Sequence, residues 1–485
     1  MKEFDEKYLA AIDLGSSKVG ICVALEQDGN LNVVHYSEVP SEGVLSSAIY
    51  IPMLTAKAVK EAVHQAEEAL MTKITGVVVG MPRNDVVQLT VSGTLQRDDP
   101  DEYVTPEEVR AIKATALESY PLPNPEKQAI YGAIAQSFTI EDGPQLSERE
   151  VVGTLTPTLE GNFKVFVGRR QAVQAIEKIF KGTGITLLKK YFIPEVIGRS
   201  VLSREELKNG VALVDIGAGV TSLSIYKGNI MRYYASFPFG GKTVTEDIET
   251  ECSLDDDLAE KIKKRFGFCM PERLGKNGEK ILQIRLTDPY KEIPVRYVSE
   301  VVTARYRELL DAILFHIGES GLQNGLRGGI VLTGGGAEQK GLETMVRELS
   351  GYNVRKGYPK YHFSAPAGCS VCRPSASAAV GMILAAHDED LPDCAAEDQG
   401  VKTVSPKDPP VETPSEPLPD ELFPGEGIVE VEAPAGKGAR SGAREGGRRT
   451  KVAPPDDGEK TGTLPLIWKT VGDALLRWYD REQQQ

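Results

Sequence analysis

The sequence predicts an α/β protein built from two related halves. Its 485 residues exceed what one hydrophobic core usually serves, so at least two lobes are expected. From Lys2 to about Ala386, short apolar runs ending in glycine alternate with stretches of helical period. One Asp-centred turn also occurs twice, in "AAIDLGSSKVGICVAL" from Ala10 and in "ALVDIGAGVTSLSIYKGN" from Ala212. Together these observations predict a duplicated α/β fold.

The elements follow one another in a regular order. Buried strands are expected at "VVVG" (77–80), "FKVFVG" (163–168), "VALVDIG" (211–217) and "GIVLTG" (329–334). Helices are expected over 55–71, 170–184 and 301–321, where apolar residues recur every three or four positions. This alternation is typical of layered α/β architecture.

Composition and charge limit the possible functions. The formal net charge of -14 argues against non-specific nucleic-acid binding, which needs a basic surface. The start, "MKEFDEKYLA", lacks a signal-peptide pattern, and no run of about eighteen apolar residues could span a bilayer. We therefore expect folding in the cytoplasm and no nucleic-acid partner.

The cysteines and histidines give no metal or catalytic pattern. Six cysteines are spread without a pairing framework, which favours reduced thiols. Cys369 and Cys372 form a lone CxxC, but no second ligand pair follows at a spacing suited to zinc. The five histidines are scattered, and we assign them no role.

The repeated turn has the chemistry of an anion site. Glycine lets backbone N–H groups approach an anion closely, because it lacks the Cβ that would block them. The aspartate would repel phosphate but can hold Mg²⁺ through the water shell of the ion, so Asp13 and Asp215 are the expected metal-holding residues. The candidate nucleotide-binding residues of the two turns are Asp13, Gly15, Ser16, Ser17 and Lys18, and Asp215, Gly217, Ala218 and Gly219.

A third motif strengthens this interpretation. "GGIVLTGGGAEQKGLETM" from Gly328 predicts a strand, a turn at Gly334, Gly335 and Gly336, and then a helix. A turn without side chains lets a flat base or sugar lie against the backbone. The order turn, turn, glycine turn therefore predicts one Mg-nucleotide bound between two halves.

The C-terminal part has a different composition. Residues 388–463 are rich in Pro, Gly, Ser, Thr and acidic residues, and a disordered linker is expected there. The run "GKGARSGAREGGRRTK" from Gly436 is basic, and a solvated linker is its simplest explanation.

The last segment, residues 464–485, regains apolar residues at helical spacing and predicts an amphipathic helix at a membrane surface, or alternatively a helix that docks on protein. Its expected membrane-binding residues are Leu464, Ile467, Trp468, Val471, Leu475, Trp478 and Tyr479.

The order of the three turns resembles the actin, Hsp70 and sugar-kinase ATPase superfamily. In such proteins the two Asp turns are the phosphate 1 and phosphate 2 hairpins, and the glycine turn is the adenosine motif. The resemblance implies ATP and Mg²⁺ as ligands. It also implies a ribose contact from a helix in the second half, for which "LAEKIKKRFG" offers Glu260 and Lys263, unless these lie on a solvated charged face.

The segments between the motifs resemble the FtsA family of bacterial cell-division proteins. They include "VTPEEVRAIKATA", "QAIYGAIAQSFTIEDG", "GTLTPTLEGNFKVFV" and "PSASAAVGMIL", together with the tail. The resemblance implies an actin-like fold with a 1C subdomain inserted in the first half. The implied divisions are 1–82 (1A, first part), 83–166 (1C), 167–200 (1A), 201–236 (2A), 237–299 (2B), 300–355 (2A), 356–387 (return to 1A), 388–463 (linker) and 464–485 (membrane-targeting helix).

The resemblance also implies a function. Such a protein binds ATP, forms filaments on the inner face of the cytoplasmic membrane at the division site, and anchors the FtsZ ring through the FtsZ C-terminal peptide. It also helps to recruit later division proteins. The peptide would dock on subdomain 2B, where Arg285 and Arg296 could meet its acidic residues.

Two departures from the family pattern concern, first, ATP contact at the second turn, which we expect to be altered or weakened, and, second, hydrolysis. The second turn has Ala218, Val220 and Ser222 where the family commonly has a glycine, a threonine and a later aspartate. Ile193 precedes Pro194 where related hydrolases place an acid, and Glu195 comes later. We expect slow ATP hydrolysis at most.

Three other functions share parts of this pattern. A small-metabolite kinase needs a catalytic carboxylate and has no use for a tethered membrane helix. An Hsp70-type chaperone needs a further β-rich domain. A pilus-assembly actin homologue shares the insert but, as the resemblance implies, lacks the tail.

Overall fold

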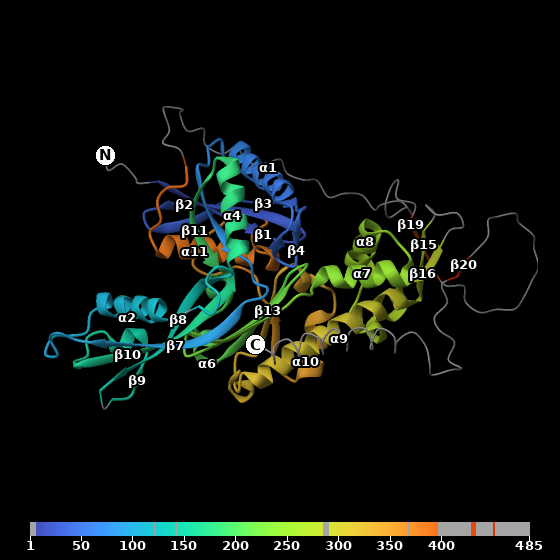
Figure 1. Cartoon of the computed structure of the whole chain (residues 1–485). Coiled ribbons are helices and arrows are strands. Elements are labelled where there is room, and N and C mark those ends of the chain that lie inside the picture. Colours follow the sequence, from blue (N-terminus) through green and yellow to red (C-terminus); the bar gives the residue numbers. More distant parts are fainter. Residues whose placement is uncertain are drawn as a thin grey trace, which may run out of the picture. The chain divides into compact units, whose positions relative to one another are not determined.

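A computed structural model of the chain describes residues 6–120, 122–141, 143–284, 291–366 and 369–395, and the backbone of 428–432 and 450–451. The chain divides into two compact units. The larger unit contains Met1–Met270 and Val301–Pro409, and the smaller unit contains Pro271–Glu300 and Pro410–Gln485. Figure 1 shows the helices and strands of the chain, coloured along the sequence.

The first half of the larger unit contains a five-stranded sheet in the order β11-β6-β1-β2-β3. The strands β1, β2 and β3 form an antiparallel meander, and β6 and β11 continue it in parallel on the other side of β1. Their bounds are β1 (Lys7–Leu14), β2 (Lys18–Gln27), β3 (Asn30–Pro40), β6 (Gly76–Met81) and β11 (Thr186–Phe192).

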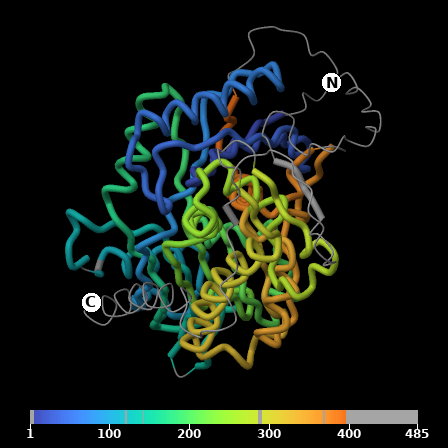
Figure 2. The backbone as a smooth tube through the Cα atoms, turned by 90° about the vertical axis from the view of Figure 1, so that its right-hand side faces the viewer, coloured from blue at the N-terminus to red at the C-terminus, as the bar shows by residue number. Residues whose placement is uncertain are grey.

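Helices cover both faces of this sheet, because residues of both faces are apolar. Leu9 and Ala11 of β1 pack with helix α11 (Ser377–Asp388), which is orange beside the blue strands (Figure 2). Ala10 and Ile12 point to the other face. That face packs against α1 (Pro52–Leu70) and α4 (Arg170–Thr183). Strands buried on both faces are typical of layered α/β proteins.

The second half repeats this sheet. Its order is β14-β13-β12-β17-β18, again a meander of three antiparallel strands continued by two parallel strands. The bounds are β12 (Val211–Ile216), β13 (Thr221–Lys227), β14 (Ile230–Phe237), β17 (Ile330–Thr333) and β18 (Val354–Lys356). The predicted duplication of an α/β fold is therefore confirmed.

A separate antiparallel sheet, β7-β10-β8-β9, lies within the first half of the sequence. It is formed by β7 (Val87–Gln96), β8 (Gln128–Ile140), β9 (Gln145–Leu146) and β10 (Thr158–Arg169), with helices α2 (Pro106–Ser119) and α3 (Glu148–Val151). Phe138 and Phe163 meet edge to face in its own core.

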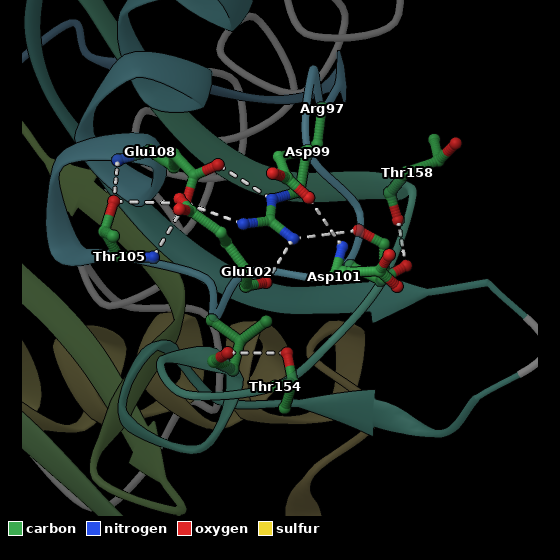
Figure 3. Close-up of polar contacts among 10 residues, drawn as sticks. Arg97, Asp99, Asp101, Glu102, Thr105, Glu108, Thr154 and Thr158 are labelled. Atoms are coloured by element: carbon green, nitrogen blue, oxygen red, sulfur yellow. Dashed lines mark hydrogen bonds and ion pairs between the residues drawn. The ribbon is translucent and has the colours of Figure 1, made fainter.

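One buried arginine ties this insert together (Figure 3). Thr105 begins α2 with a reciprocal cap, in which Thr105 Oγ1 accepts the Glu108 N–H and Glu108 accepts the Thr105 N–H. The Arg97 guanidinium donates to Glu108 Oε1 at 2.7 Å and to two loop carbonyls, of Glu102 and Thr156. These bonds fix the loop that leads into α2.

Shorter elements complete the larger unit. The first-half sheet is followed by the small hairpin β4 (Val44–Leu45) and β5 (Ala48–Ile49). The helices that connect the second half are α5 (Ile193–Val201), α6 (Arg204–Asn209), α7 (Gly241–Cys252), α8 (Asp256–Phe266), α9 (Val295–Glu319, which begins in the smaller unit) and α10 (Leu342–Ser350).

The smaller unit contains a sheet in the order β19-β15-β16-β20. Two of its strands, β15 (Lys280–Ile284) and β16 (Lys291–Pro294), form an antiparallel pair. The other two, β19 (Ile428–Glu432) and β20 (Thr450–Lys451), come from the region predicted to be a linker.

The structure describes residues 388–395, 428–432 and 450–451 of the predicted linker 388–463. Residues up to Ala395 belong to the packed body, since the Cys394 N–H donates to Tyr8 O at 2.8 Å and Cys394 is buried. Further on, "IVEVE" alternates apolar and acidic residues, a strand pattern that a composition average over the region conceals. The predicted helix 464–485 lies outside the described residues.

Candidate functional site

The first Asp turn, residues 13–18, joins β1 to β2. The Gly15 N–H donates to Lys18 O at 2.9 Å, and a methyl group on Gly15 would lie 2.7 Å from that oxygen. The turn is therefore tight enough to require glycine. Asp13 lies opposite Gly20 in the hairpin, and its Oδ1 is buried with no hydrogen-bond partner among the described residues.

The second Asp turn, residues 215–220, repeats this geometry between β12 and β13. The Gly217 N–H donates to Val220 O at 2.9 Å, and a methyl group on Gly217 would lie 2.8 Å from it. Asp215 is buried opposite Ser222. The Val220 side chain is itself buried in the fold, which accounts for a hydrophobic residue at this position.

The glycine turn, residues 334–336, lies directly against the second Asp turn. Gly334 has φ +82°, and a methyl group there would lie 2.3 Å from Asp215 Oδ1. Gly336 packs on the Ile216 side chain and accepts a hydrogen bond from the Tyr306 hydroxyl at 3.0 Å. A methyl group on Gly335 would meet no atom within 4 Å, so this residue leaves its face of the turn open.

The two Asp turns meet each other. A methyl group on Gly219 would lie 2.8 Å from Ser16 Oγ and 3.1 Å from the Ser46 nitrogen. Ser16 Oγ also accepts the Ser47 N–H at 3.2 Å. Ser46 and Ser47 both have positive φ, a strained backbone for non-glycine residues that often marks functional loops. No sequence motif indicates these two serines.

Arg83 connects the two halves at this point. It follows β6, and its guanidinium forms an ion pair with the Asp215 carboxylate. Both side chains are largely buried, with 11% of Arg83 and 6% of Asp215 exposed. No sequence motif indicates Arg83, because a single arginine after a strand carries no pattern.

The start of α7 fixes the second Asp turn. The Gly241 and Lys242 N–H groups donate to Gly217 O at 2.9 Å and to Ala218 O at 2.8 Å. A methyl group on Gly240 would lie 2.4 Å from Gly217 O, so glycine is needed for this approach. The pair "GG" before a helical stretch is the sequence signal for this close approach.

Glu260 and Lys263 of α8 lie beside this helix start and are not merely a solvated charged face. Lys263 is buried, and its ammonium donates to Gly241 O at 2.7 Å, Thr245 Oγ1 at 2.8 Å and Glu260 Oε2 at 2.6 Å.

Burial lowers the pKa of Lys263, and the Glu260 charge opposes that effect. Burial would raise the pKa of Glu260, but the Lys263 ammonium and its hydrogen bond outweigh burial and lower it.

Other predicted residues lie apart from this cluster. The Lys18 ammonium pairs with Glu38 on the neighbouring strand. Arg296, in the smaller unit, is exposed and lies 3.4 Å from Glu300 Oε1. Arg285 and the seven expected membrane-binding residues lie outside the described residues.

Glu195, the acid that follows Pro194, does not line the cavity beside the first Asp turn. Ile193 lines a small cavity with Leu14, Ser47 and Arg83, and no acidic residue is found among the described residues that line it. Glu195 lines a different cavity of about 240 Å³. Burial, only partly opposed by Lys113, raises the pKa of Glu195.

Within the described ranges, no group of three or more His, Cys, Asp or Glu side chains is arranged to hold a metal ion. No helix in the described part of the chain is long and apolar enough to cross a membrane.

This arrangement defines an actin-like ATPase fold. The two five-stranded sheets have the same strand arrangement, and in each an Asp-centred turn joins the first two strands along the chain. The glycine turn follows later in the second half. The fold of a chain in a PilM-PilN type IV pilus biogenesis complex is similar, with a TM-score of 0.54 and 17% identity over 78% of this chain and 98% of that chain.

Within that class, sequence relatives identify the protein more closely. A family model described as "Cell division protein FtsA" matches residues 212–381. Cell division protein FtsA of Neisseria meningitidis is 28% identical over 390 residues, which cover 79% of this chain and 91% of that protein. The Enterococcus hirae protein of the same name is 29% identical and covers 72% and 77%. This chain is an FtsA homologue, and the resemblance predicted from its motifs is confirmed.

Proposed function

We propose that this cell-division protein binds one Mg-nucleotide, ATP, between its two Asp turns. The observation that carries the proposal is the meeting of all three motifs around Asp215: Gly334 contacts its carboxylate, and Gly219 of the same turn contacts Ser16 of the other half. Small residues and backbone N–H groups at one place suit phosphate groups.

The residues present fit such a ligand. Asp13 has a buried carboxylate oxygen without a partner among the described residues, and Asp215 stands at the equivalent place of the second turn. These two would hold Mg²⁺ through its water shell, and the ion would neutralise phosphate charge. The open face of Gly335 would lie against the base or sugar. Glu260 would support the ribose, with its carboxylate oriented by Lys263.

Titration of the full chain with Mg-ATP should show one nucleotide per chain and slow hydrolysis. Slow turnover is expected because no acidic residue is found among the described residues that line the cavity beside the first turn. The steady-state rate should stay below about 1 per second, the low end of ordinary enzyme rates. Binding without measurable turnover agrees with the proposal, and a clearly faster rate contradicts the assignment of a structural ligand.

We further propose that the chain acts at the inner face of the cytoplasmic membrane at the division site. It would polymerise there, tether the FtsZ ring through the FtsZ C-terminal peptide and help to recruit later division proteins. The FtsA relatives and the amphipathic pattern of residues 464–485 support this assignment. The peptide would bind in the 2B region, where Arg296 is exposed and accessible to an acidic residue.

Replacing Trp468 and Trp478 with alanine should release the full chain from liposomes. The segment carries balanced charges, so inserted aromatic and aliphatic side chains supply most of its affinity. The measurement is pelleting with vesicles in the presence of Mg-ATP and a labelled FtsZ C-terminal peptide. A chain ending at Gly462 should also stay in solution. Unchanged pelleting of the tryptophan variant would refute this anchor.

A kinase or a pilus scaffold is not favoured. The similar pilus protein supports the fold alone at 17% identity. The curated relatives described above are cell-division proteins and cover most of both chains.

A further inference from the structure

Arg83 is held in place by both halves of the larger unit. Its N–H donates to Ser47 Oγ at 3.2 Å in the first half. Its carbonyl accepts the Tyr234 hydroxyl at 2.5 Å from β14 in the second half. The backbone position of Arg83 is therefore fixed beside both Asp turns.

The guanidinium of Arg83 has an N–H donor without a partner among the described residues. One of its nitrogens pairs with Asp215, but Nε is buried with no hydrogen-bond partner among the described residues. A guanidinium presents five donors in a planar fork that matches phosphate oxygens in pairs. Arg83 therefore carries a charge suited to phosphate at the place where the phosphates of the proposed ligand would lie.

Asp215 cannot keep Arg83 as its counterion and also hold hydrated Mg²⁺ on the same oxygen. Two cations at one buried carboxylate repel each other strongly, because the surroundings screen them poorly. An arriving Mg-nucleotide brings both a second cation for Asp215 and phosphate oxygens for the displaced guanidinium. The ion pair and the ligand complex are then alternative ways to satisfy the same two side chains.

We propose that Arg83 is a phosphate-binding residue of the nucleotide site, and that Mg²⁺ takes its place at Asp215 when the nucleotide binds. This inference rests on the proposed nucleotide function and adds a residue that no motif indicates. Arg83 would oppose Mg²⁺ at Asp215 but favour phosphate. Removal of the guanidinium should therefore affect Mg²⁺ and nucleotide in opposite directions.

The first test is Arg83→Gln in the full chain, with ATP affinity measured over a range of Mg²⁺ concentrations. At saturating Mg²⁺ the Kd should rise about tenfold or more, the usual size of a lost charged hydrogen bond. The half-saturating Mg²⁺ concentration should fall about fivefold, a typical coupling between two ligands of one site. Weaker ATP binding with an unchanged or higher Mg²⁺ requirement would show a merely structural role and overturn the inference.

A matched control is Arg169→Gln, which removes an arginine from the exposed ion pair with Asp85. Its ATP and Mg²⁺ curves should match those of the original protein. If the original protein does not bind Mg-ATP, the proposed function itself fails. If it binds but Arg83→Gln behaves identically, only the role of Arg83 fails.

A second variant tests the inference even if Arg83→Gln does not fold. Asp215→Asn frees the guanidinium without a change of shape, so metal-free ATP in the presence of a chelator should bind about fivefold tighter than to the original protein. The gain should vanish in the double variant Asp215→Asn with Arg83→Gln, which separates the guanidinium from the lost negative charge. Equal or weaker binding of metal-free ATP by Asp215→Asn contradicts the proposal.

Discussion

Gly334→Ala should lower the free energy of unfolding by about 3 kcal/mol or more and weaken Mg-ATP binding at least about tenfold. With φ +82° and ψ 165°, Gly334 occupies a backbone region that is nearly exclusive to glycine. Its new methyl group would also lie 2.3 Å from Asp215 Oδ1 and 2.5 Å from Ile216 O. Both atoms belong to the second Asp turn, so relief of the collision displaces the proposed metal-holding carboxylate.

The neighbouring Gly335 provides the matched control. A methyl group there meets no atom within 4 Å, so Gly335→Ala should change the free energy of unfolding by less than about 0.5 kcal/mol. Its ATP affinity should nevertheless fall, since the open face is the expected base or sugar contact. Urea unfolding and ATP titration of both variants measure these effects. Equal stability of the two variants would show that the packing of Gly334 on Asp215 is not needed.

Lys263→Met should destabilise the larger unit by about 3 kcal/mol. The substitution removes the cation that three buried or half-buried acceptors share, and it leaves the Glu260 carboxylate without its buried cationic partner. It should also weaken ATP binding, because Gly241 O loses the ammonium while the Gly241 N–H holds the second Asp turn through Gly217 O. Urea unfolding and ATP titration provide the measurements.

The pH dependence of this destabilisation should show that it arises from loss of the Lys263–Glu260 ion pair. Lys263 holds the pKa of Glu260 below its ordinary value, although burial alone would raise it. The stability gained from this lowering is present above the unfolded pKa of about 4.3 and is lost as pH falls through the lower folded value. The difference between the original protein and Lys263→Met should therefore shrink below about pH 4.

Lys264→Met is the control for this pair. Lys264 also reaches Glu260, at 3.2 Å from Oε1, but 72% of its side chain is exposed. An exposed pair contributes little, so its loss should cost less than about 0.5 kcal/mol. A similar cost for both lysine variants would contradict the assigned role of the buried ammonium.

The candidate site residues that could be located from the sequence are those within short turn motifs. Asp13, Gly15, Asp215, Gly217 and the glycine turn stand in motifs whose short-range geometry is tight. They could therefore be located by spacing alone, and the structure brings these turns together. The duplicated α/β fold was equally predictable, because both halves repeat one order of strands.

Residues brought in by long-range packing could not be predicted in this way. Arg83, Ser46 and Ser47 reach the site because β6 and the small hairpin lie beside the first Asp turn, and none of them has a motif. The strand β19 was hidden because five alternating residues lie within a region dominated by Pro, Gly and charge. The Lys18 side chain pairs with Glu38. This partner depends on the register between β2 and β3, which no local motif specifies.

We expect one Mg-nucleotide to contact both halves of the larger unit at the same time. Hydrogen–deuterium exchange of the full chain, with and without Mg-ATP, tests it most directly. Peptides that contain residues 13–18, 215–220 and 334–336 should all exchange more slowly with the nucleotide, and with the same dependence on its concentration. Protection of one half alone, or of none of these turns, would contradict binding between the two Asp turns.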